Sequence, residues 1–335
     1  MTHHKPILVC GAGSWGTALA IHLAQVYPVY LWTRRPAHCE QMRQTRVNQD
    51  YLPDVLLPEQ LTPIDQWSDV IAECGIILTA IPSKSFAPFI EQLTPYLQPN
   101  QHNIINAAKG FCHDQQKRLS EIAQHYCPTI PFGVITGPSF AKETAKGLPT
   151  TVVLASTNHT LLTHGQQCFS HGNFRCYTSE DIIGAEIGGA LKNVFAIATG
   201  ICDGLGFGSN AKTGLITRGL IEITRFGQAF GAYRDTLYGL SGLGDLILTC
   251  TDDQSRNRRF GLAIGAGQTV EQAQQTVQQV VEGALSTQTV AALSQQHGID
   301  MPITQATYQI LFQSLSAQKA LELLINRPLK SETTH

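Results

Sequence analysis

The stretch Ile7-Leu8-Val9-Cys10-Gly11-Ala12-Gly13-Ser14-Trp15-Gly16 decides the fold of the N-terminal half. Its four leading apolar residues predict a buried strand, and Thr17–Gln25 predicts the helix that follows. The turn between them has the pattern G-x-G-x-x-G. Gly11 permits a tight turn, Gly13 lets a phosphate approach the backbone, and Gly16 lets helix and strand pack closely. Because amide groups and the positive helix end then face the phosphates, the stretch predicts a dinucleotide-binding site.

Glycine-rich turns of this kind also bind flavins, occur in methyltransferases or serve only tight packing. The next predicted strand, Val29–Thr33, favours dinucleotide binding over these alternatives. Sites that prefer NAD usually place an Asp or Glu here to bind the ribose 2′-hydroxyl. This chain has Arg34-Arg35-Pro36 and no acid, and arginines suit a ribose 2′-phosphate. We expect NADP(H) to be favoured and NAD(H) to be possible. The alternative is a solvated basic turn, and the sequence does not say which arginine would meet the phosphate.

Short apolar runs alternate with helical segments through the first half, which is typical of a parallel sheet with crossover helices. The predicted strands are Ile7–Cys10, Val29–Thr33, Ile76–Ile81, Asn103–Ala107, Phe132–Thr136, Thr151–Ala155 and Phe174–Tyr177. Small or polar residues follow almost all of them, and ligands bind at the carboxyl ends of such strands.

From about Ser179 onward strands give way to helices. The predicted helical segments are a stripe over Ile187–Ile201, Lys212–Gly231, a helix opened by the capping box Thr269–Gln272, a further helix stopped by Gly298, Ile303–Gln313 and Ala317–Asn326. The expected fold class is α/β. A Rossmann-like doubly wound sheet over residues 1–180 would bind the dinucleotide, and an all-helical domain over 181–335 would bind substrate and carry catalytic residues.

Composition excludes several other functions. Charged residues make up 14% of the chain, and 23 basic against 25 acidic residues give a net charge of −2, so we expect no nucleic-acid partner. The apolar stretch Ile182–Cys202 contains Glu186 and Lys192, so we expect no membrane span. The opening residues MTHHKP do not resemble a signal peptide, which favours a cytoplasmic protein.

The nine cysteines do not form a metal or redox motif. The closest two, Cys168 and Cys176, are eight positions apart, so the chain has no C-x-x-C pair. We expect them to be small buried hydrophobic residues in a reducing compartment. His3 and His4 are taken as terminal residues, and no metal site is expected.

Two glycines inside a predicted helix draw attention to Lys192. In Gly188-Gly189-Ala190-Leu191-Lys192-Asn193 each glycine costs about 1 kcal/mol relative to alanine. They lie on the same helix face as the lysine, one turn before it, so Lys192 would project over a surface without side chains. The pattern therefore favours a lysine that meets a ligand. The alternative is an exposed helix lysine beside glycines that serve packing.

Three other polar clusters are candidates for the same site. Lys109 in Asn106-Ala-Ala-Lys-Gly110 follows a strand, and Asp245 ends the glycine-lined turn Gly242-Leu-Gly-Asp245. The segment Ser255-Arg-Asn-Arg-Arg-Phe-Gly261 holds three arginines among seven residues. This density of positive charge favours a binding site for a phosphate dianion. The alternative is a charged surface at the start of a helix.

The motifs GAGSWG, AAKG, GPSFAKE, GGALKNV, GLGDL and SRNRRFG, in this order over essentially the whole chain, closely resemble the bacterial-type NAD(P)-dependent glycerol-3-phosphate dehydrogenases. The resemblance implies interconversion of sn-glycerol 3-phosphate and dihydroxyacetone phosphate, which supplies phospholipid synthesis. It implies a homodimer, and Lys192 as general acid and base with Lys109 and Asp245 beside the reacting carbons.

The resemblance also assigns binding residues. Those for the substrate are Lys109, Gly137, Ser139, Lys192, Asp245, Ser255, Arg256 and Asn257. Those for the coenzyme are Ser14, Trp15, Arg34, Lys109, Ala141, Arg256, Val280 and Glu282. The sequence pattern itself adds Gly11, Gly13, Gly16 and Arg35 as candidates for the same site.

Two other functions stay open at this point. A hydroxyisobutyrate- or ketopantoate-type reductase would also have a helical-domain lysine, but it has no evident use for three clustered arginines. A non-catalytic NADP(H)-sensing protein would keep the glycine pattern, but it does not need Lys192, Lys109 and Asp245 together.

Overall fold

The computed structural model describes residues 5–277 and 281–328, and the chain divides into two compact units. The first unit comprises Met1–Gly189 and Phe230–Asp245, and the second comprises Ala190–Ala229 and Leu246–His335. The chain leaves the first unit within helix α7 (Ile182–Gly204), returns to it and leaves it again. No single cut in the chain therefore separates the two units.

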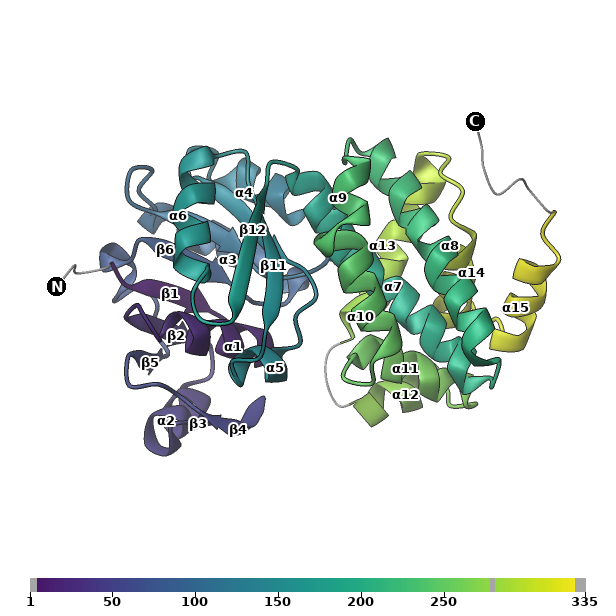
Figure 1. Ribbon diagram of the computed structural model, residues 1–335, viewed down its shortest axis with the longest axis horizontal. Coiled ribbons are helices and arrows are strands. Elements are labelled where there is room, and N and C mark those ends of the chain that lie inside the picture. The colour runs from purple at the N-terminus through teal and green to yellow at the C-terminus, as the bar shows by residue number, and fades with distance from the viewer. Residues whose placement is uncertain (1–4, 278–280, 329–335) are drawn as a thin grey trace. The chain divides into compact units, whose positions relative to one another are not determined.

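The first unit is built on an eight-stranded sheet in the order β12-β11-β10-β7-β6-β1-β2-β5 (Figure 1). The strands are β1 (Ile7–Cys10), β2 (Val29–Trp32), β5 (Leu61–Ile64), β6 (Ile76–Thr79), β7 (Asn103–Asn106), β10 (Phe132–Thr136), β11 (Thr150–Ala155) and β12 (Phe174–Ser179). Every neighbouring pair is parallel except β10 and β11. The strand order reverses at β1, which lies between β2 and β6, so the carboxyl end of β1 is at the switch point where ligands bind in such sheets.

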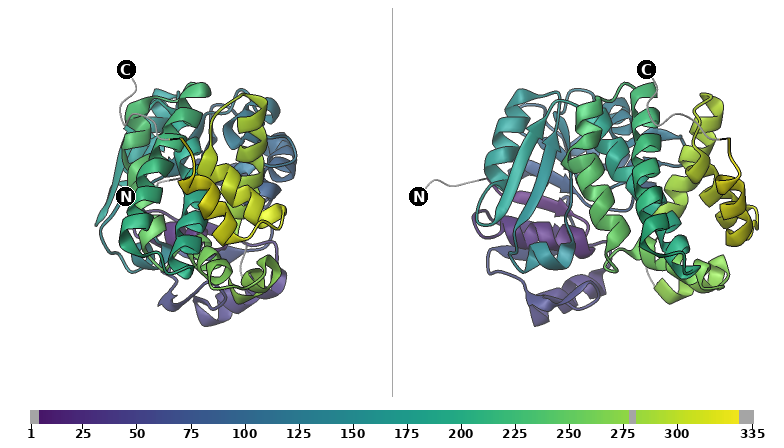
Figure 2. Two further views of the ribbon diagram at one scale, coloured as in Figure 1. Left: turned by 90° about the vertical axis from the view of Figure 1, so that its right-hand side faces the viewer. Right: turned by 45° about the vertical axis from the view of Figure 1, so that its right-hand side comes forward.

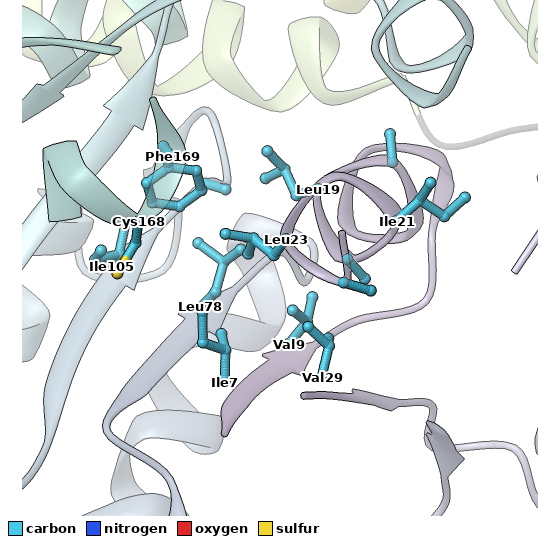
Figure 3. Close-up of a cluster of buried hydrophobic side chains, with 14 of the residues drawn as sticks. Ile7, Val9, Leu19, Ile21, Leu23, Val29, Leu78, Ile105, Cys168 and Phe169 are labelled. Carbon is cyan, nitrogen blue, oxygen red and sulfur yellow. The ribbon is translucent and has the colours of Figure 1, made fainter. Parts of the chain in front are cut away.

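Helices cover both faces of this sheet, because successive side chains on a strand point to opposite faces. The covering helices are α1 (Ser14–Leu23), α3 (Phe86–Leu93), α4 (Leu119–Tyr126) and α6 (His159–Phe169). Ile7 and Val9 belong to the apolar cluster beneath α1 and α6, part of which Figure 3 shows. Leu8 and Cys10 belong to the cluster beneath α3 and α4. The predicted α/β fold class is confirmed.

Shorter elements complete the first unit. They are helices α2 (Pro36–Thr45), α5 (Ala141–Ala145) and α9 (Arg234–Tyr238), the π-helical turn η4 (Leu240–Gly244), the 3-10 turns η1 (Ile71–Glu73), η2 (Ser83–Ser85) and η3 (Thr94–Tyr96), and the strand pairs β3 (Val47–Asn48) with β4 (Leu52–Leu56) and β8 (Phe111–Cys112) with β9 (Lys117–Arg118).

All seven predicted strands occur, and Ile7–Cys10 and Phe132–Thr136 have the predicted bounds. The sheet is parallel, as predicted, except at β11, which pairs antiparallel with β10. After β10 the chain turns at Gly137, where φ is +136°, forms α5 against α1 and returns antiparallel. Strand β5 is not among the predicted strands. It contains Pro63, whose missing N–H is tolerated because β5 lies at the sheet edge.

The described part of the second unit contains only helices, as Figure 2 shows. After the second half of α7 come α8 (Gly208–Ala229), α10 (Asp245–Thr251), α11 (Arg256–Gly265), α12 (Val270–Val277), α13 (Glu282–Gln296), α14 (Pro302–Phe312) and α15 (Ala317–Ile325). The capping box is present, because Thr269 and Gln272 exchange side-chain to backbone hydrogen bonds of 2.9 and 3.2 Å. Gly298, with φ of +63°, follows α13 as predicted.

Helix α7 has 23 residues and is apolar enough to cross a membrane by length and composition. However, 83% of its most apolar window is buried inside the protein, so it is the core helix of a soluble protein. All nine cysteines are also buried and free, as expected of small hydrophobic residues.

Helices α7 and α11 approach each other through glycines within the second unit. A Cβ on Gly200 would collide with the Arg258 carbonyl oxygen, and a Cβ on Gly261 would collide with that of Ile197. Gly204 and Gly265 repeat this relation one turn further along. The two backbones are therefore in direct contact, and this contact requires glycine on both helices.

We expect Gly261→Ala to lower the free energy of unfolding by about 1–3 kcal/mol, because the added methyl group overpacks this contact. Gly214→Ala in α8 is the matched control, since a Cβ there meets nothing within 4 Å. That change should instead stabilise the protein by about 0.4–1 kcal/mol. Urea unfolding followed by circular dichroism measures both. Equal effects would contradict the close approach of the two helices.

His22 of α1 is a buried histidine outside the candidate site. Its Nε2 lies 2.8 Å from the Phe169 carbonyl oxygen, and its ring stacks on His171 at 3.9 Å. Burial lowers the pKa of His22 from 6.5 to about 4; the hydrogen bond to Phe169 opposes this shift and the charge of His171 adds to it. The folded protein therefore holds this ring neutral at pH values where the unfolded chain protonates it.

Stability from this group is present above pH 6.5 and is lost as the pH falls toward 4. We expect His22→Gln, which can still donate to Phe169, to remove up to about 3 kcal/mol of that acid dependence. Urea unfolding at several pH values measures the slope. The exposed His164→Gln is the control and should leave the slope unchanged; an unchanged slope in His22→Gln would show that other groups cause the acid dependence.

Candidate active site

The glycine loop follows β1 at the switch point of the sheet. Gly11 has a φ of +121°, and a Cβ there would lie 2.6 Å from the Ala80 carbonyl oxygen, directly after β6. A Cβ on Gly16 would collide with the Gly11 carbonyl oxygen, whereas one on Gly13 would meet nothing within 4 Å. Ser14 begins α1, whose first turn contains no acidic residue. An open backbone at a helix N-terminus fits a dinucleotide pyrophosphate.

The basic turn after β2 contains two arginines in different surroundings. Both are exposed. Arg35 Nη2 lies 2.6 Å from Asp50 Oδ2, in an ion pair whose side chains are 49% and 50% exposed. Among the described residues Arg34 has no hydrogen-bond or ion-pair partner. The turn itself contains no acidic residue, but the fold places Asp50, from the segment after β3, beside Arg35.

Lys109 and Asp245 form a close ion pair in the first unit. Lys109 Nζ lies 2.5 Å from Asp245 Oδ2, and the two side chains are 17% and 1% exposed. Nζ also donates to the Gly137 carbonyl oxygen at 3.2 Å, and this oxygen accepts a second hydrogen bond of 2.9 Å from Ser139 Oγ. The two predicted residues, 136 positions apart, are therefore brought together with Gly137 and Ser139. The charge-assisted hydrogen bond to the buried Asp245 carboxylate therefore holds the Lys109 ammonium group in one orientation.

The structure corrects the role predicted for the helix glycines. A Cβ on Gly188 would collide with the Ser241 carbonyl oxygen of η4, and one on Gly189 would lie 2.9 Å from Thr136 Oγ1 and 3.6 Å from Lys109 Cγ. The space is thus filled by protein and is not open to a ligand. The predicted alternative of an exposed lysine is also wrong, since Lys192 is only 7% exposed.

Thr136 is a buried residue that sequence analysis missed. It is 1% exposed, and its Oγ1 has no hydrogen-bond partner among the described residues. The only sequence signal is its position at the end of β10, directly before Gly137.

The serine–arginine–asparagine segment lies at the start of α11 in the second unit. Ser255 caps the helix by accepting a hydrogen bond from the Arg258 backbone at 3.2 Å. Asn257 donates to Asn193 Oδ1 at 2.9 Å and accepts from the Gly283 backbone at 3.0 Å. Asn193 directly follows Lys192 in α7, so these bonds tie the helix start to the helix that carries the lysine.

The cluster of three arginines does not act as one cationic site. Arg258 is buried and pairs with Asp203 at 2.5 Å and with Asp253. Its charge is therefore neutralised within the protein, and the expected triple-arginine anion site is wrong in this respect. Arg256 and Arg259 are exposed, and Arg256 is the first residue of α11.

The remaining predicted positions lie at the ends of elements. Ala141 begins α5, which packs against α1, and Glu282 begins α13. Trp15 is in the first turn of α1, and its Nε1 is buried without a hydrogen-bond partner among the described residues. Val280 lies outside the described residues. Within the described ranges, no three His, Cys, Asp or Glu side chains are grouped as metal ligands would be.

A doubly wound sheet with a glycine loop at its switch point, followed by a helical unit with a buried lysine, defines a two-domain NAD(P)-dependent dehydrogenase. Family comparisons identify which one. Residues 6–162 match the model of the NAD-dependent glycerol-3-phosphate dehydrogenase N-terminus, and residues 181–322 match that of its C-terminus. The chain belongs to this family.

Individual relatives agree with this assignment. The chain is 49% identical over 330 residues to glycerol-3-phosphate dehydrogenase [NAD(P)+] of Francisella tularensis subsp. novicida, covering 98% of this chain and 99% of the relative. It is 42% identical to the crystal structure of glycerol-3-phosphate dehydrogenase from Coxiella burnetii, with a TM-score of 0.93 over 96% and 99% of the two chains. A ketopantoate reductase from Ralstonia eutropha is 13% identical with a TM-score of 0.55 over 94% and 99% of the chains, so it shares the fold alone.

Proposed function

We propose that this protein catalyses the NAD(P)-dependent interconversion of sn-glycerol 3-phosphate and dihydroxyacetone phosphate. The observation that carries the proposal is the Lys109–Asp245 ion pair, whose carboxylate is buried. Lys109 follows β7, and the glycine loop follows β1, in a sheet where both strands run parallel. Because the carboxyl ends of parallel strands share one edge, the charged pair and the dinucleotide loop lie at the same edge of the sheet.

The coenzyme would be held by the first unit. The loop from Gly11 to Gly16 and the amides of α1 face the pyrophosphate, and the basic turn at Arg34 faces the ribose 2′-phosphate. When bound, the reduced coenzyme supplies hydride to C2 of the ketone. The protein has to supply a proton to the C2 oxygen and to stabilise the negative charge that develops there.

Lys192 is the proposed general acid, and it acts as base in the reverse direction. Helix α7 is continuous through Gly189, where an added Cβ would lie 3.6 Å from Lys109 Cγ, and Lys192 follows one turn later. With 7% exposure the Lys192 residue is largely removed from water, and a low-dielectric surrounding strengthens the interaction of its charge with a developing alkoxide. Lys109, oriented by Asp245, adds a second positive charge toward the same oxygen.

The second unit is proposed to bind the substrate phosphate through Ser255, Arg256 and Asn257. The capped N-terminus of α11 presents backbone amides, and Arg256 adds a guanidinium at its first residue. Arg258 serves this site indirectly, because its pairs with Asp203 and Asp253 hold the helix start in place. Holding the phosphate fixes C2 relative to the hydride donor, which is a proximity effect.

Two further features of the proposal come from the family resemblance: a homodimer, and supply of glycerol 3-phosphate to phospholipid synthesis. A cytoplasmic location and a domain boundary near residue 180 are proposed from the sequence pattern itself.

Lys192→Met tests the mechanism. We expect turnover of dihydroxyacetone phosphate with NADPH to fall by at least about 100-fold, while NADPH affinity stays near that of the wild type. Absorbance of the nicotinamide band measures the rate, and calorimetry measures binding. Lys117→Met, an exposed lysine of β9, is the control and should keep full activity. Turnover within a few-fold of wild type would show that Lys192 is a packing residue. A wild-type protein that binds NADPH but reduces no ketone would favour a sensor.

Arg34→Ala tests coenzyme preference. Because this arginine has no protein partner among the described residues, we expect its loss to lower kcat/KM for NADPH by about 10-fold or more and to leave NADH unchanged. The wild-type preference for NADPH should shrink as salt rises, since the side chain is exposed. An equal loss for both coenzymes would assign Arg34 to the fold.

A further inference from the structure

The segment Asn48–Tyr51 contacts both stretches assigned to the coenzyme, although no sequence motif points to it. Asn48 ends the short strand β3 and is fully buried. Its Nδ2 donates to the Ala12 carbonyl oxygen at 3.0 Å and to Thr17 Oγ1 at 2.8 Å. Ala12 lies inside the glycine loop and Thr17 in the first turn of α1. Asn48 therefore fixes the loop to the helix whose N-terminus faces the pyrophosphate.

The oxygen of the same Asn48 side-chain amide is connected by hydrogen bonds to the basic turn that contains Arg34 and Arg35. Asn48 Oδ1 lies 2.9 Å from His38 Nε2, and His38 Nδ1 lies 3.1 Å from Thr33 Oγ1. Because Oδ1 can only accept, Nε2 donates the hydrogen bond to Asn48, and Nδ1 is hydrogen-bonded to the Thr33 hydroxyl. All three side chains are buried. Thr33 directly precedes Arg34, so this chain of hydrogen bonds joins the glycine loop to the turn that faces the 2′-phosphate.

Beyond Asn48 the segment reaches the surface beside the arginines. The Asp50 carboxylate pairs with Arg35 at 2.6 Å, and the Tyr51 carbonyl oxygen accepts a hydrogen bond of 3.3 Å from Ser14 Oγ in α1. A carboxylate on Arg35 competes directly with a phosphate for the same guanidinium. An exposed pair of this kind contributes little to stability, so the arginine can exchange one anion for the other.

We propose that Asn48–Tyr51 is a third element of the coenzyme site, in which Asn48 positions the glycine loop for both coenzymes and Asp50 limits the preference for NADPH. This rests on the proposed function, because it takes the basic turn as the 2′-phosphate site. In this proposal Arg35 joins Arg34 at the 2′-phosphate, so that binding of NADPH draws Arg35 away from Asp50, whereas binding of NADH leaves the pair intact. The two residues therefore affect different quantities. Asn48 acts on the affinity for both coenzymes, and Asp50 acts on the ratio of the two affinities.

Isothermal titration of NADPH and NADH into the full-length protein separates these effects. We expect Asp50→Asn to tighten NADPH binding by about two- to five-fold and to leave NADH unchanged, which is the range of an exposed ion pair. Asp54→Asn is the matched control. It removes an equal charge four positions away, from an exposed side chain with no partner among the described residues, and should change neither affinity.

Asn48→Ala should weaken both coenzymes by about ten-fold, since the loop loses a buried hydrogen bond. If that variant does not fold, Thr17→Val removes the hydroxyl that Asn48 binds and should weaken both coenzymes by about two- to five-fold.

The outcomes are distinct. Equal behaviour of Asp50→Asn and Asp54→Asn overturns the role of Asp50. Wild-type affinities in a folded Asn48→Ala, or in Thr17→Val, overturn the role of Asn48. A wild-type protein that binds neither NADPH nor NADH contradicts the proposed function itself.

Discussion

The absence of a side chain at Gly188 is the constraint on which the arrangement of the first unit's charged pair depends. The η4 turn lies so close to α7 that a Cβ at this position would collide with the Ser241 carbonyl oxygen. The turn is itself tight, because a Cβ on Gly242 would collide with the Leu237 carbonyl oxygen. Asp245 follows directly and reaches Lys109 from there. Gly188 and Gly242 thus leave space into which neighbouring backbone packs. This packing places the Asp245 carboxylate beside Lys109.

The same use of glycine recurs where α7 continues into the second unit. There Gly200 admits the backbone of α11, the helix that begins with the predicted phosphate-binding residues. Helix α7 therefore belongs to both units. Its first half packs against the turn before Asp245 in the first unit, and its second half packs against α11 in the second unit. Precise placement of charged groups on rigid elements is what a hydride-transfer site needs, because misplacement by about 1 Å is costly in rate.

Much of the fold follows from local sequence. The strand at Ile7–Cys10 is fully apolar and ends at a glycine, so both its type and its bounds are predictable. The antiparallel β11 is not, because its direction depends on how the intervening α5 packs. At the site, residue types indicate Lys109 and Asp245 individually, but their 2.5 Å contact joins residues that only the fold brings together. Arg258 shows the reverse case, since sequence counts its charge but cannot show the buried acids that neutralise it.

The interleaving of the two units has a consequence for biosynthesis on the ribosome. Lys109 is synthesised 136 residues before Asp245, and residues 190–229 between them belong to the other unit. At typical translation rates the lysine waits on the order of ten seconds for its carboxylate. The nascent sheet can form meanwhile, because all eight of its strands precede residue 180. Translation therefore delivers the eight-stranded sheet first and the Lys109–Asp245 ion pair later, and a chain truncated between residues 180 and 245 would contain the sheet without the pair.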